Sequence, residues 1–570
     1  MNKIGRYSCA AFTAVFALAV FCFFCFQYRY HVAYQEQYQL FEWTAGYFAS
    51  VCSVPGGFAD WCGRFLVQFF LQAPAGAAIY AILLALVQIL CYLTFRSRNL
   101  FLYALSFIPA LLLWLFCCNE NSLPGAVVAV ILALAALCAT FKSGMKPVFR
   151  LLLIPVLYML CGPVAGVYAL AVCADRFRPS VLACSLLILA ACPFAAQFIF
   201  HRTLLQLSTG VHYFRYPFVL AWMPLIVSAI AAALCLVAAL DWSGVRPSTG
   251  NWLGWCIAMV MAAAVPFAVR SNCDFRKEKS MKYDFLARYH LWNRTIDSAA
   301  HSQPDSPMTV SCLNLALAMN SQLADHQFEF FQNGPDGLLP GFVRDFTSPL
   351  PTAEAYWNLG MVNTAQRYTF EAQEAIPDHQ KSARCYKRLA QTNMVNGDFD
   401  VARKYLDALD KTMFYRNWAR GMRKAIDDGT VMEDPELKRV CSLRLRDHDF
   451  LFSETEMDSM IGLLMVENPS NGIATQYLMS WCLLKKDLDR FEQCFSLIRG
   501  SVMKKSYQEA LLLLWASTHT GMEGLPMDLQ GPNVGRLGKF LEAYQGGVSE
   551  QEMQKRFGDT YWFYYFYRYR

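Results

Sequence analysis

The sequence predicts an all-α protein in two parts, a polytopic bundle of transmembrane helices followed by a soluble helical domain. Hydrophobic residues make up 55% of the chain and charged residues only 16%, which is too apolar for a soluble protein of this length. The charge is also uneven, because residues 1–270 hold 15 Lys and Arg against 6 Asp and Glu, whereas residues 271–570 hold 35 and 38. We therefore expect the membrane part to end near Arg270.

About nine apolar runs in the first part have the composition of membrane spans. A helix needs about 20 mainly apolar residues to cross the hydrocarbon core of a bilayer. The first run extends from Tyr7 to about Tyr28 and is too long for a cleaved signal peptide, so we expect an uncleaved anchor. The later runs lie at about 73–95, 100–118, 124–141, 148–160, 163–174, 181–200, 217–240 and 252–269.

The basic residues of the connecting loops predict the orientation, because Lys and Arg gather on the cytoplasmic side. With the N-terminus inside, ten of them face the cytoplasm: Lys3, Arg6, Arg96, Arg98, Lys142, Lys146, Arg150, Arg176, Arg178 and Arg246. Five face outward: Arg29, Arg64, Arg202, Arg215 and Arg270.

The fifth and sixth runs are short and are joined by Gly162 and Pro163. They form either one kinked helix or a hairpin buried among its neighbours. Only a hairpin keeps Arg176 and Arg178 inside. The number of spans is then odd, and the domain that follows Arg270 is exported.

The first external loop, residues 29–72, is amphipathic and aromatic, which is typical of helices that lie along the membrane interface. Four of the six acidic residues of the membrane part face outward. Glu36, Glu42 and Asp60 lie in this loop and Glu120 lies in the next one.

Residues 271–570 show the apolar spacing of helical hairpins. The clearest hairpin covers residues 382–409, where two amphipathic helices flank the turn Asn396-Gly397-Asp398. Weaker copies begin at Ala353 and Ala474. This spacing resembles the tetratricopeptide repeat and predicts a TPR-like α-solenoid.

The chain ends in YWFYYFYRYR, in which eight of ten residues are aromatic. Such a tail does not stay exposed to water. We expect it to dock onto the solenoid or the membrane interface; an aromatic sugar-binding strip is the alternative.

Several signals of catalysis are absent. The sequence has no GxxxxGK[ST] loop, no GxSxG elbow, no HExxH and no strand-bound GxGxxG. The deep parts of the spans are nearly free of charge, which argues against a proton-coupled transporter. Nothing indicates a nucleic-acid partner.

The layout of the whole chain resembles the GT-C superfamily of multi-span glycosyltransferases, some of which carry tetratricopeptide repeats. It is also similar to an uncharacterised family of bacterial inner-membrane proteins with the same plan. The resemblance implies transfer of a sugar or glycan from a polyprenyl-phosphate-linked donor to an acceptor protein or glycan. It implies a multi-pass protein of the bacterial inner membrane, with a cytoplasmic N-terminus, a periplasmic C-terminal domain and membrane lipids as further partners.

The resemblance also suggests site residues. GT-C enzymes carry an acidic residue early in the first external loop, which corresponds best to Glu36. Glu36, alone or with Glu120, would act as the catalytic carboxylate. No cofactor is required by the sequence, although both carboxylates could hold a divalent metal such as Mg²⁺ or Mn²⁺. Glu42 and Asp60 rank lower, because Glu42 follows Phe41 on the presumed interfacial face and Asp60 lies beside a turn.

A late external loop supplies the candidate lipid-phosphate site. Arg202 and Arg215 could clamp phosphate oxygens, with hydrogen bonds from His201 and Tyr213. Two other functions stay open. The chain could be a membrane-anchored scaffold or assembly factor whose repeats bind envelope proteins, or a transporter or flippase.

Overall fold

The computed structural model describes most of the chain. It leaves out residues 1–2, 98, 175–177, 217–218, 241–246, 344, 346, 378–379, 446–455, 499–501, 520, 522–523 and 569–570. Arg98, Arg176 and Arg246, which support the predicted orientation, therefore lie outside the described residues. The described residues form helices and no β-strand, apart from one isolated bridge between Ser122 and Phe214. The predicted all-α class is confirmed.

The chain folds as two compact units. The first, here called the membrane unit, contains residues 1–278, 377–383 and 409–416. The C-terminal unit contains residues 279–376, 384–408 and 417–570. The membrane unit thus continues past Arg270 and takes in two short segments from much later in the sequence.

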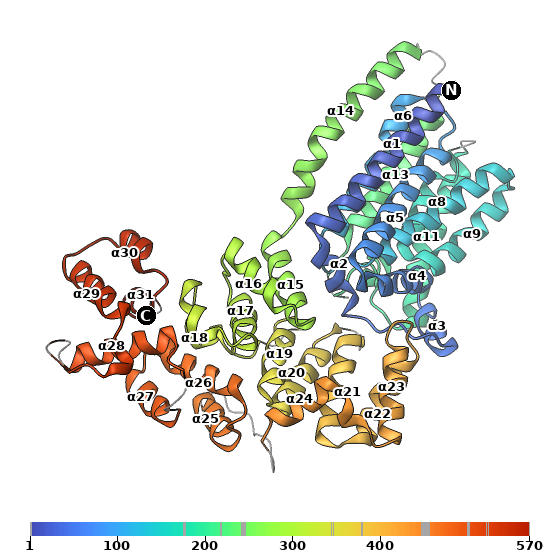
Figure 1. The fold of residues 1–570 in the computed structure, drawn as a ribbon. Helices are drawn as coiled ribbons and strands as arrows, with labels where there is room; N and C mark the ends of the chain where they lie inside the picture. The colour runs from blue at the N-terminus through green and yellow to red at the C-terminus, as the bar shows by residue number, and fades with distance from the viewer. Residues whose placement is uncertain are drawn as a thin grey trace. The chain divides into compact units, whose positions relative to one another are not determined.

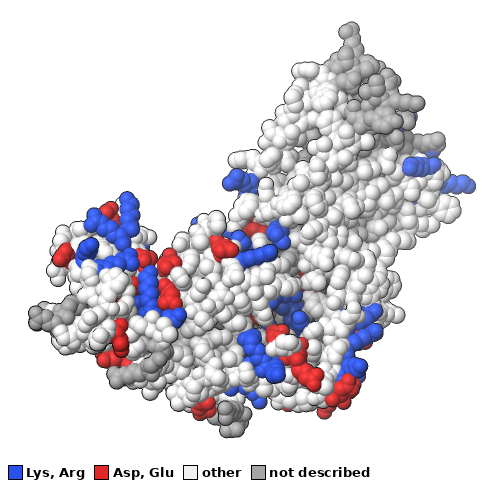
Figure 2. Space-filling model, in the orientation of Figure 1, with Lys and Arg blue, Asp and Glu red and all other residues white. Residues whose placement is uncertain are grey.

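Eight helical stretches among the described residues are long and apolar enough to cross a membrane. They are Cys9–Gln27, Ala73–Thr94, Leu100–Cys117, Gly125–Ser143, Pro147–Ala171, Pro179–Phe200, Trp222–Ala239 and Trp252–Asn272. Figure 2 shows the visible face of this helix bundle nearly free of charged side chains. The chain is a multi-pass membrane protein, as its composition predicted.

The helices of the bundle run side by side in Figure 1, with α14 at the edge. They are α1 (Lys3–Cys22), α5 (Ala73–Thr94), α6 (Leu100–Leu105), α7 (Phe107–Cys117), α8 (Gly125–Ser143), α9 (Pro147–Cys161), α10 (Gly166–Ala171), α11 (Pro179–Phe200), α13 (Trp222–Ala239) and α14 (Pro247–Asn272). Shorter helices lie in the connections: α2 (Arg29–Glu36), α3 (Ala45–Cys52), α4 (Gly57–Val67) and α12 (Leu204–Thr209).

The stretch Pro147–Ala171 doubles back on itself. The chain breaks after α9 at Gly162, whose φ is 62°, and α10 then returns. Arg150, near the start of α9, donates a hydrogen bond from Nη1 to the carbonyl oxygen of Val172, just after α10, at 3.1 Å. Both ends of the stretch therefore lie at the same end of the bundle, as in the hairpin alternative.

One end of the bundle gathers the long connections, and we call it the loop end: residues 28–72, 117–124, 201–216, 219–221 and 272–278. The Tyr28 hydroxyl donates to the carbonyl oxygen of Cys118 at 3.2 Å. The Asn272 amide donates to the carbonyl oxygen of Leu115 at 2.7 Å. The chain thus leaves the bundle at the same end as the long first loop.

The described part of the C-terminal unit consists mainly of helices. Its helices are α15 (Phe275–Arg288), α16 (Trp292–His301), α17 (Pro307–Met319), α18 (Leu323–His326), α19 (Pro349–Leu359), α20 (Val362–Glu374), α21 (Ala383–Asn396), α22 (Phe399–Asp410), α23 (Arg416–Asp427), α24 (Pro435–Leu443), α25 (Met457–Glu467), α26 (Gly472–Lys485), α27 (Leu488–Leu497), α28 (Lys505–Thr518), α29 (Pro532–Gln545), α30 (Glu550–Phe557) and α31 (Tyr561–Tyr567). The turn between α21 and α22 is the predicted one, because Gly397 has a φ of 84°.

The core of this unit contains paired charges. Arg384 holds Asp284 with two hydrogen bonds of 2.7 and 2.9 Å. Arg388 donates to Glu354 at 2.6 Å and to Glu436 at 3.1 Å. Burial alone would raise the pKa of Glu436, but Arg388 outweighs it and lowers that pKa to about 2. Buried charges are retained in proteins when they are paired in this way.

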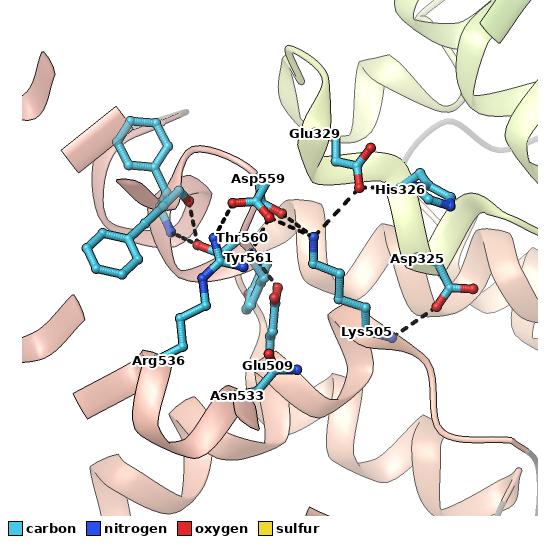
Figure 3. Close-up of polar contacts among 12 residues, drawn as sticks. Asp325, His326, Glu329, Lys505, Glu509, Asn533, Arg536, Asp559, Thr560 and Tyr561 are labelled. Atoms are coloured by element: carbon cyan, nitrogen blue, oxygen red, sulfur yellow. Dashed lines mark hydrogen bonds and ion pairs between the residues drawn. The ribbon is translucent and has the colours of Figure 1, made fainter. Parts of the chain in front are cut away.

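The aromatic tail forms α31 and docks within the C-terminal unit, as shown in Figure 3. The Tyr561 N–H donates to the Glu509 carboxylate of α28 at 2.8 Å. Asp559, just before α31, accepts from Arg536 at 2.5 Å and from Lys505 at 3.0 Å. Glu509 is fully buried, and burial raises its pKa to about 7.

Candidate functional site

A polar cavity of about 270 Å³ lies at the loop end of the membrane unit. It is lined by three loop segments that are distant in sequence, namely residues 40–64, 202–212 and 380–381. The lining residues are Leu40, Glu42, Tyr47, Ser50, Val51, Val54, Asp60, Arg64, Arg202, His212, Gln380 and Lys381. We call it the Asp60 cavity.

Two glycines of the α4 region help to position Asp60, one at the start of the helix and one against α8. Gly56 caps the helix with a φ of 83°, a conformation that glycine adopts without strain. Gly63 packs against the first residue of α8, since a Cβ on Gly63 would lie 2.4 Å from the Gly125 nitrogen. These small residues let the two helices approach closely. The carboxylate of Asp60 consequently sits on the buried face of α4, only 2% exposed.

Two basic side chains face Asp60. Arg64, one turn later in α4, places Nη2 2.7 Å from Asp60 Oδ2. His212 places Nδ1 3.5 Å from the same oxygen. Burial alone would lower the pKa of Arg64, but Asp60 and Tyr47 outweigh it and raise that pKa above its ordinary value. Arg64 therefore stays charged beside Asp60.

The remaining charges of the Asp60 cavity make it positive. Arg64 also donates to Gln380 Oε1 at 2.5 Å, and Lys381 pairs with Glu42 at 2.8 Å. Arg202 forms no hydrogen bond or ion pair with the part of the chain that the structure describes. With His212 neutral, three cations oppose two carboxylates, so the cavity favours an anionic ligand.

Glu36 lies outside the Asp60 cavity. It ends α2, is 4% exposed and accepts a 2.8 Å hydrogen bond from the Tyr415 hydroxyl. It lines a separate cavity of only about 20 Å³, which is room for about one water. A sugar does not fit there, so the structure gives no support to the catalytic role expected for Glu36.

Glu120 is engaged in another contact. Its Oε1 lies 2.5 Å from the ammonium of Lys277, and it does not line the Asp60 cavity. No group of three or more His, Cys, Asp or Glu side chains forms a potential metal site within the described residues. Glu36 is bonded to Tyr415 and Glu120 is paired with Lys277. The two carboxylates therefore do not form the divalent-metal site that the sequence suggested.

Of the four expected phosphate-binding residues, only Arg202 lines the Asp60 cavity. Arg215 lies over the ring of Tyr38, 4.4 Å from its centroid, and burial lowers its pKa. His201 is exposed and ends α11 with a φ of 50°. Arg215 and His201 therefore do not line the Asp60 cavity together with Arg202, as a shared phosphate site would require.

Tyr213 has a structural role instead of the expected substrate contact. It is 2% exposed. Its hydroxyl donates to the carbonyl oxygen of Cys161 and accepts from the Val164 N–H at 3.2 Å. It thereby satisfies two backbone groups where the chain turns between α9 and α10.

On sequence alone, Asp60 ranks below Glu36. Arg64 and His212 have no assigned role there, although the structure places both beside Asp60. The signal for Asp60 and Arg64 is their i, i+4 spacing, which puts a carboxylate and a guanidinium on the same face of a helix. His212 carries no comparable signal, because it comes from a loop 150 residues away.

A family model, described as a family of unknown function (DUF6057), matches residues 5–568. The chain therefore belongs to this family over almost its whole length. Comparison with curated proteins and with solved structures found no match.

Proposed function

We propose that this member of the family is a membrane glycosyltransferase that uses a polyprenyl-phosphate-linked donor. The observation that carries the proposal is the Asp60 cavity, where a buried carboxylate, a histidine and an excess of cations lie together at one end of an apolar helix bundle. Glycosyl transfer from a lipid phosphate needs a base near the membrane surface and cations for the phosphate.

The residues of the cavity suit these two tasks. Arg202 and Lys381 would bind the donor phosphate, with Arg64 adding positive charge behind them. Asp60 would orient His212 through Nδ1, leaving Nε2 to accept the proton of the acceptor hydroxyl. The acceptor oxygen would then attack the anomeric carbon, whose bond to the phosphate oxygen breaks and releases polyprenyl phosphate.

The size of the cavity limits the transferred group. At about 270 Å³ it lies near the lower end of ligand pockets, which hold about 300–1,000 Å³. It suits a sugar and its phosphate better than a long glycan. We therefore favour transfer of a single sugar to a protein or glycan acceptor.

The proposal includes the orientation of the chain in a bacterial inner membrane. The loop end and the C-terminal unit would face the periplasm and the N-terminus the cytoplasm, following the Lys and Arg bias of the loops. In this orientation the Asp60 cavity would bind lipid-linked sugars on the extracytoplasmic side.

A second candidate is a scaffold or assembly factor for envelope proteins. It is favoured by the helical hairpins of the C-terminal unit, such as α21 and α22 with the turn at Gly397, which resemble tetratricopeptide repeats. A scaffold would need no ionic cavity at the loop end, and nothing in the hairpins requires Asp60.

The decisive experiment measures sugar transfer from radiolabelled polyprenyl-phosphate sugars to endogenous acceptors in membranes. We expect Asp60→Asn to lower turnover about a hundredfold, because His212 without the carboxylate that orients it would lose most of a general-base contribution of that usual size. Glu120→Gln is the control and should retain activity, because Glu120 lies outside the cavity. No transfer by the native protein with any donor, or full transfer by Asp60→Asn, would refute the proposal.

A further inference from the structure

A second and larger cavity lies within the membrane unit. It occupies about 910 Å³ between α1, α6, α7 and α14. Its walls are almost entirely apolar along its length, and they end at the loop end with the polar side chains of Gln27 and Arg270. We call it the α14 groove. It shares no lining residue with the Asp60 cavity.

The groove is closed where α14 touches the bundle at both ends. Far from the loop end, a Cβ on Gly254 would lie 2.8 Å from the backbone of Leu100, and the rings of Phe12 and Trp255 meet edge to face at 5.3 Å. At the loop end, Asn272 bonds to the carbonyl oxygen of Leu115. Between these contacts α14 stands away from the bundle.

The α14 groove is long and apolar. From Gly254 to Arg270, α14 rises about 24 Å at about 1.5 Å per residue. The groove has a volume of about 910 Å³ along that length and is lined almost entirely by apolar side chains. Such a space suits the hydrocarbon chains of a lipid.

The volume also indicates how much hydrocarbon fits. At about 30 Å³ for each non-hydrogen atom, taking the share of a water molecule in the liquid, the groove holds about 30 atoms. That matches the two acyl chains of one phospholipid. A polyprenyl carrier chain is considerably longer.

The polar end of the groove favours an anionic headgroup. Arg270 is exposed and forms no hydrogen bond or ion pair with any residue that the structure describes. An arginine at the membrane interface binds phosphate oxygens through its planar guanidinium. We propose that the α14 groove binds one anionic phospholipid, with its acyl chains between α1 and α14 and its phosphate at Arg270.

The test uses the full-length protein in phosphatidylcholine nanodiscs, with phosphatidylglycerol added as the probe and bound lipid counted by native mass spectrometry. Ala262 lines the groove, whereas its neighbour Ala263 is exposed and does not line it. We expect one phosphatidylglycerol on the native protein and on Ala263→Trp, and at least tenfold lower occupancy on Ala262→Trp.

Two further variants keep the result interpretable. Ala258→Leu fills the groove more mildly and should lower occupancy even if Ala262→Trp does not fold. Arg270→Gln should keep a bound lipid but lose the preference for phosphatidylglycerol over phosphatidylcholine.

Equal occupancy in the groove-filling variants and the native protein would overturn the proposal. So would copurification of a polyprenyl phosphate in place of the phospholipid, or the absence of retained lipid on the native protein. Equal occupancy or absence of phospholipid would leave the sugar-transfer proposal unaffected, because that proposal depends on the Asp60 cavity.

Discussion

The carboxylate of Asp60 lies 2.7 Å from the guanidinium of Arg64, and the two side chains are 2% and 13% exposed. Each is therefore the main electrostatic partner of the other, and little of either side chain is exposed. Removing one partner of such a pair leaves an uncompensated charge, which costs more than removing both.

Arg64→Leu should therefore destabilise the protein by about 3 kcal/mol or more, as expected for a buried pair that loses one partner. The double variant Asp60→Asn with Arg64→Leu should recover much of this loss. The measurement is thermal unfolding in detergent. If the double variant were no more stable than Arg64→Leu, the pair would not be buried as described.

Glu36→Gln should leave sugar transfer nearly unchanged, because the amide oxygen of Gln can still accept the hydrogen bond of Tyr415 and the adjoining cavity is too small for a sugar. The measurement compares the turnover of Glu36→Gln with that of Asp60→Asn in the same sugar-transfer assay. A loss of about a hundredfold, the size of a general-base contribution, would instead make Glu36 the catalytic carboxylate.

Gly397→Ala should lower the free energy of unfolding by about 1 kcal/mol, because its φ of 84° is unfavourable for any residue with a Cβ. Gly421→Ala is the matched control. Both sites have open space around an added Cβ, but Gly421 lies inside helix α23, where alanine should stabilise by up to about 1 kcal/mol. Shifts of the same sign in thermal unfolding would contradict the turn at Gly397.

The C-terminal unit should lose stability as the pH rises from about 5 to 7. Burial raises the pKa of Glu509 from 4.5 to about 7, so in this window the folded state binds a proton that the unfolded state has released, and folding is penalised as the proton is lost. Glu509→Gln should flatten this dependence in thermal unfolding between pH 5 and 8. Asp559 does not interfere, since Arg536 and Lys505 outweigh its burial and lower its pKa to about 2. If the stability of the native protein were constant across this range, Glu509 would not have the raised pKa described here.

An alkaline phosphatase fused after residue 570 should be active, because the positive-inside rule and the hairpin at Gly162 together predict that the C-terminal unit is exported. A fusion to the loop between α8 and α9 should be inactive. Cytoplasmic reporter activity at the C-terminus would reverse the orientation and move the Asp60 cavity to the other side of the membrane.

The spans and the turn glycine could be predicted because each depends on local sequence. Apolar length alone identifies a membrane helix, and the Gly397 turn follows from the residues on either side of it. The hairpin at Gly162 could be stated only as one of two alternatives, since the hydrogen bond that distinguishes them joins Arg150 to the backbone of Val172.

The candidate site could not be predicted in the same way. Ranking the outward acids by closeness to a span favoured Glu36. Both carboxylates are buried, but only Asp60 lines the larger cavity. The position of Asp60 depends on the contact between Gly63 and Gly125, which joins two separate helices. Of the residues expected to bind substrate, only Arg202, chosen for its unexplained charge in an external loop, lines the Asp60 cavity.

Gln380 and Lys381 belong to the same cavity as Asp60 although more than 300 residues separate them in sequence. The ribosome therefore finishes all the membrane helices long before it delivers the last wall of this cavity. A chain arrested before residue 377 would be inserted but would lack both late segments of the membrane unit. Arg64 would then have no Gln380 to bond, and the Asp60 cavity of the newly inserted protein would stay incomplete until residue 381 of the 570 has been added.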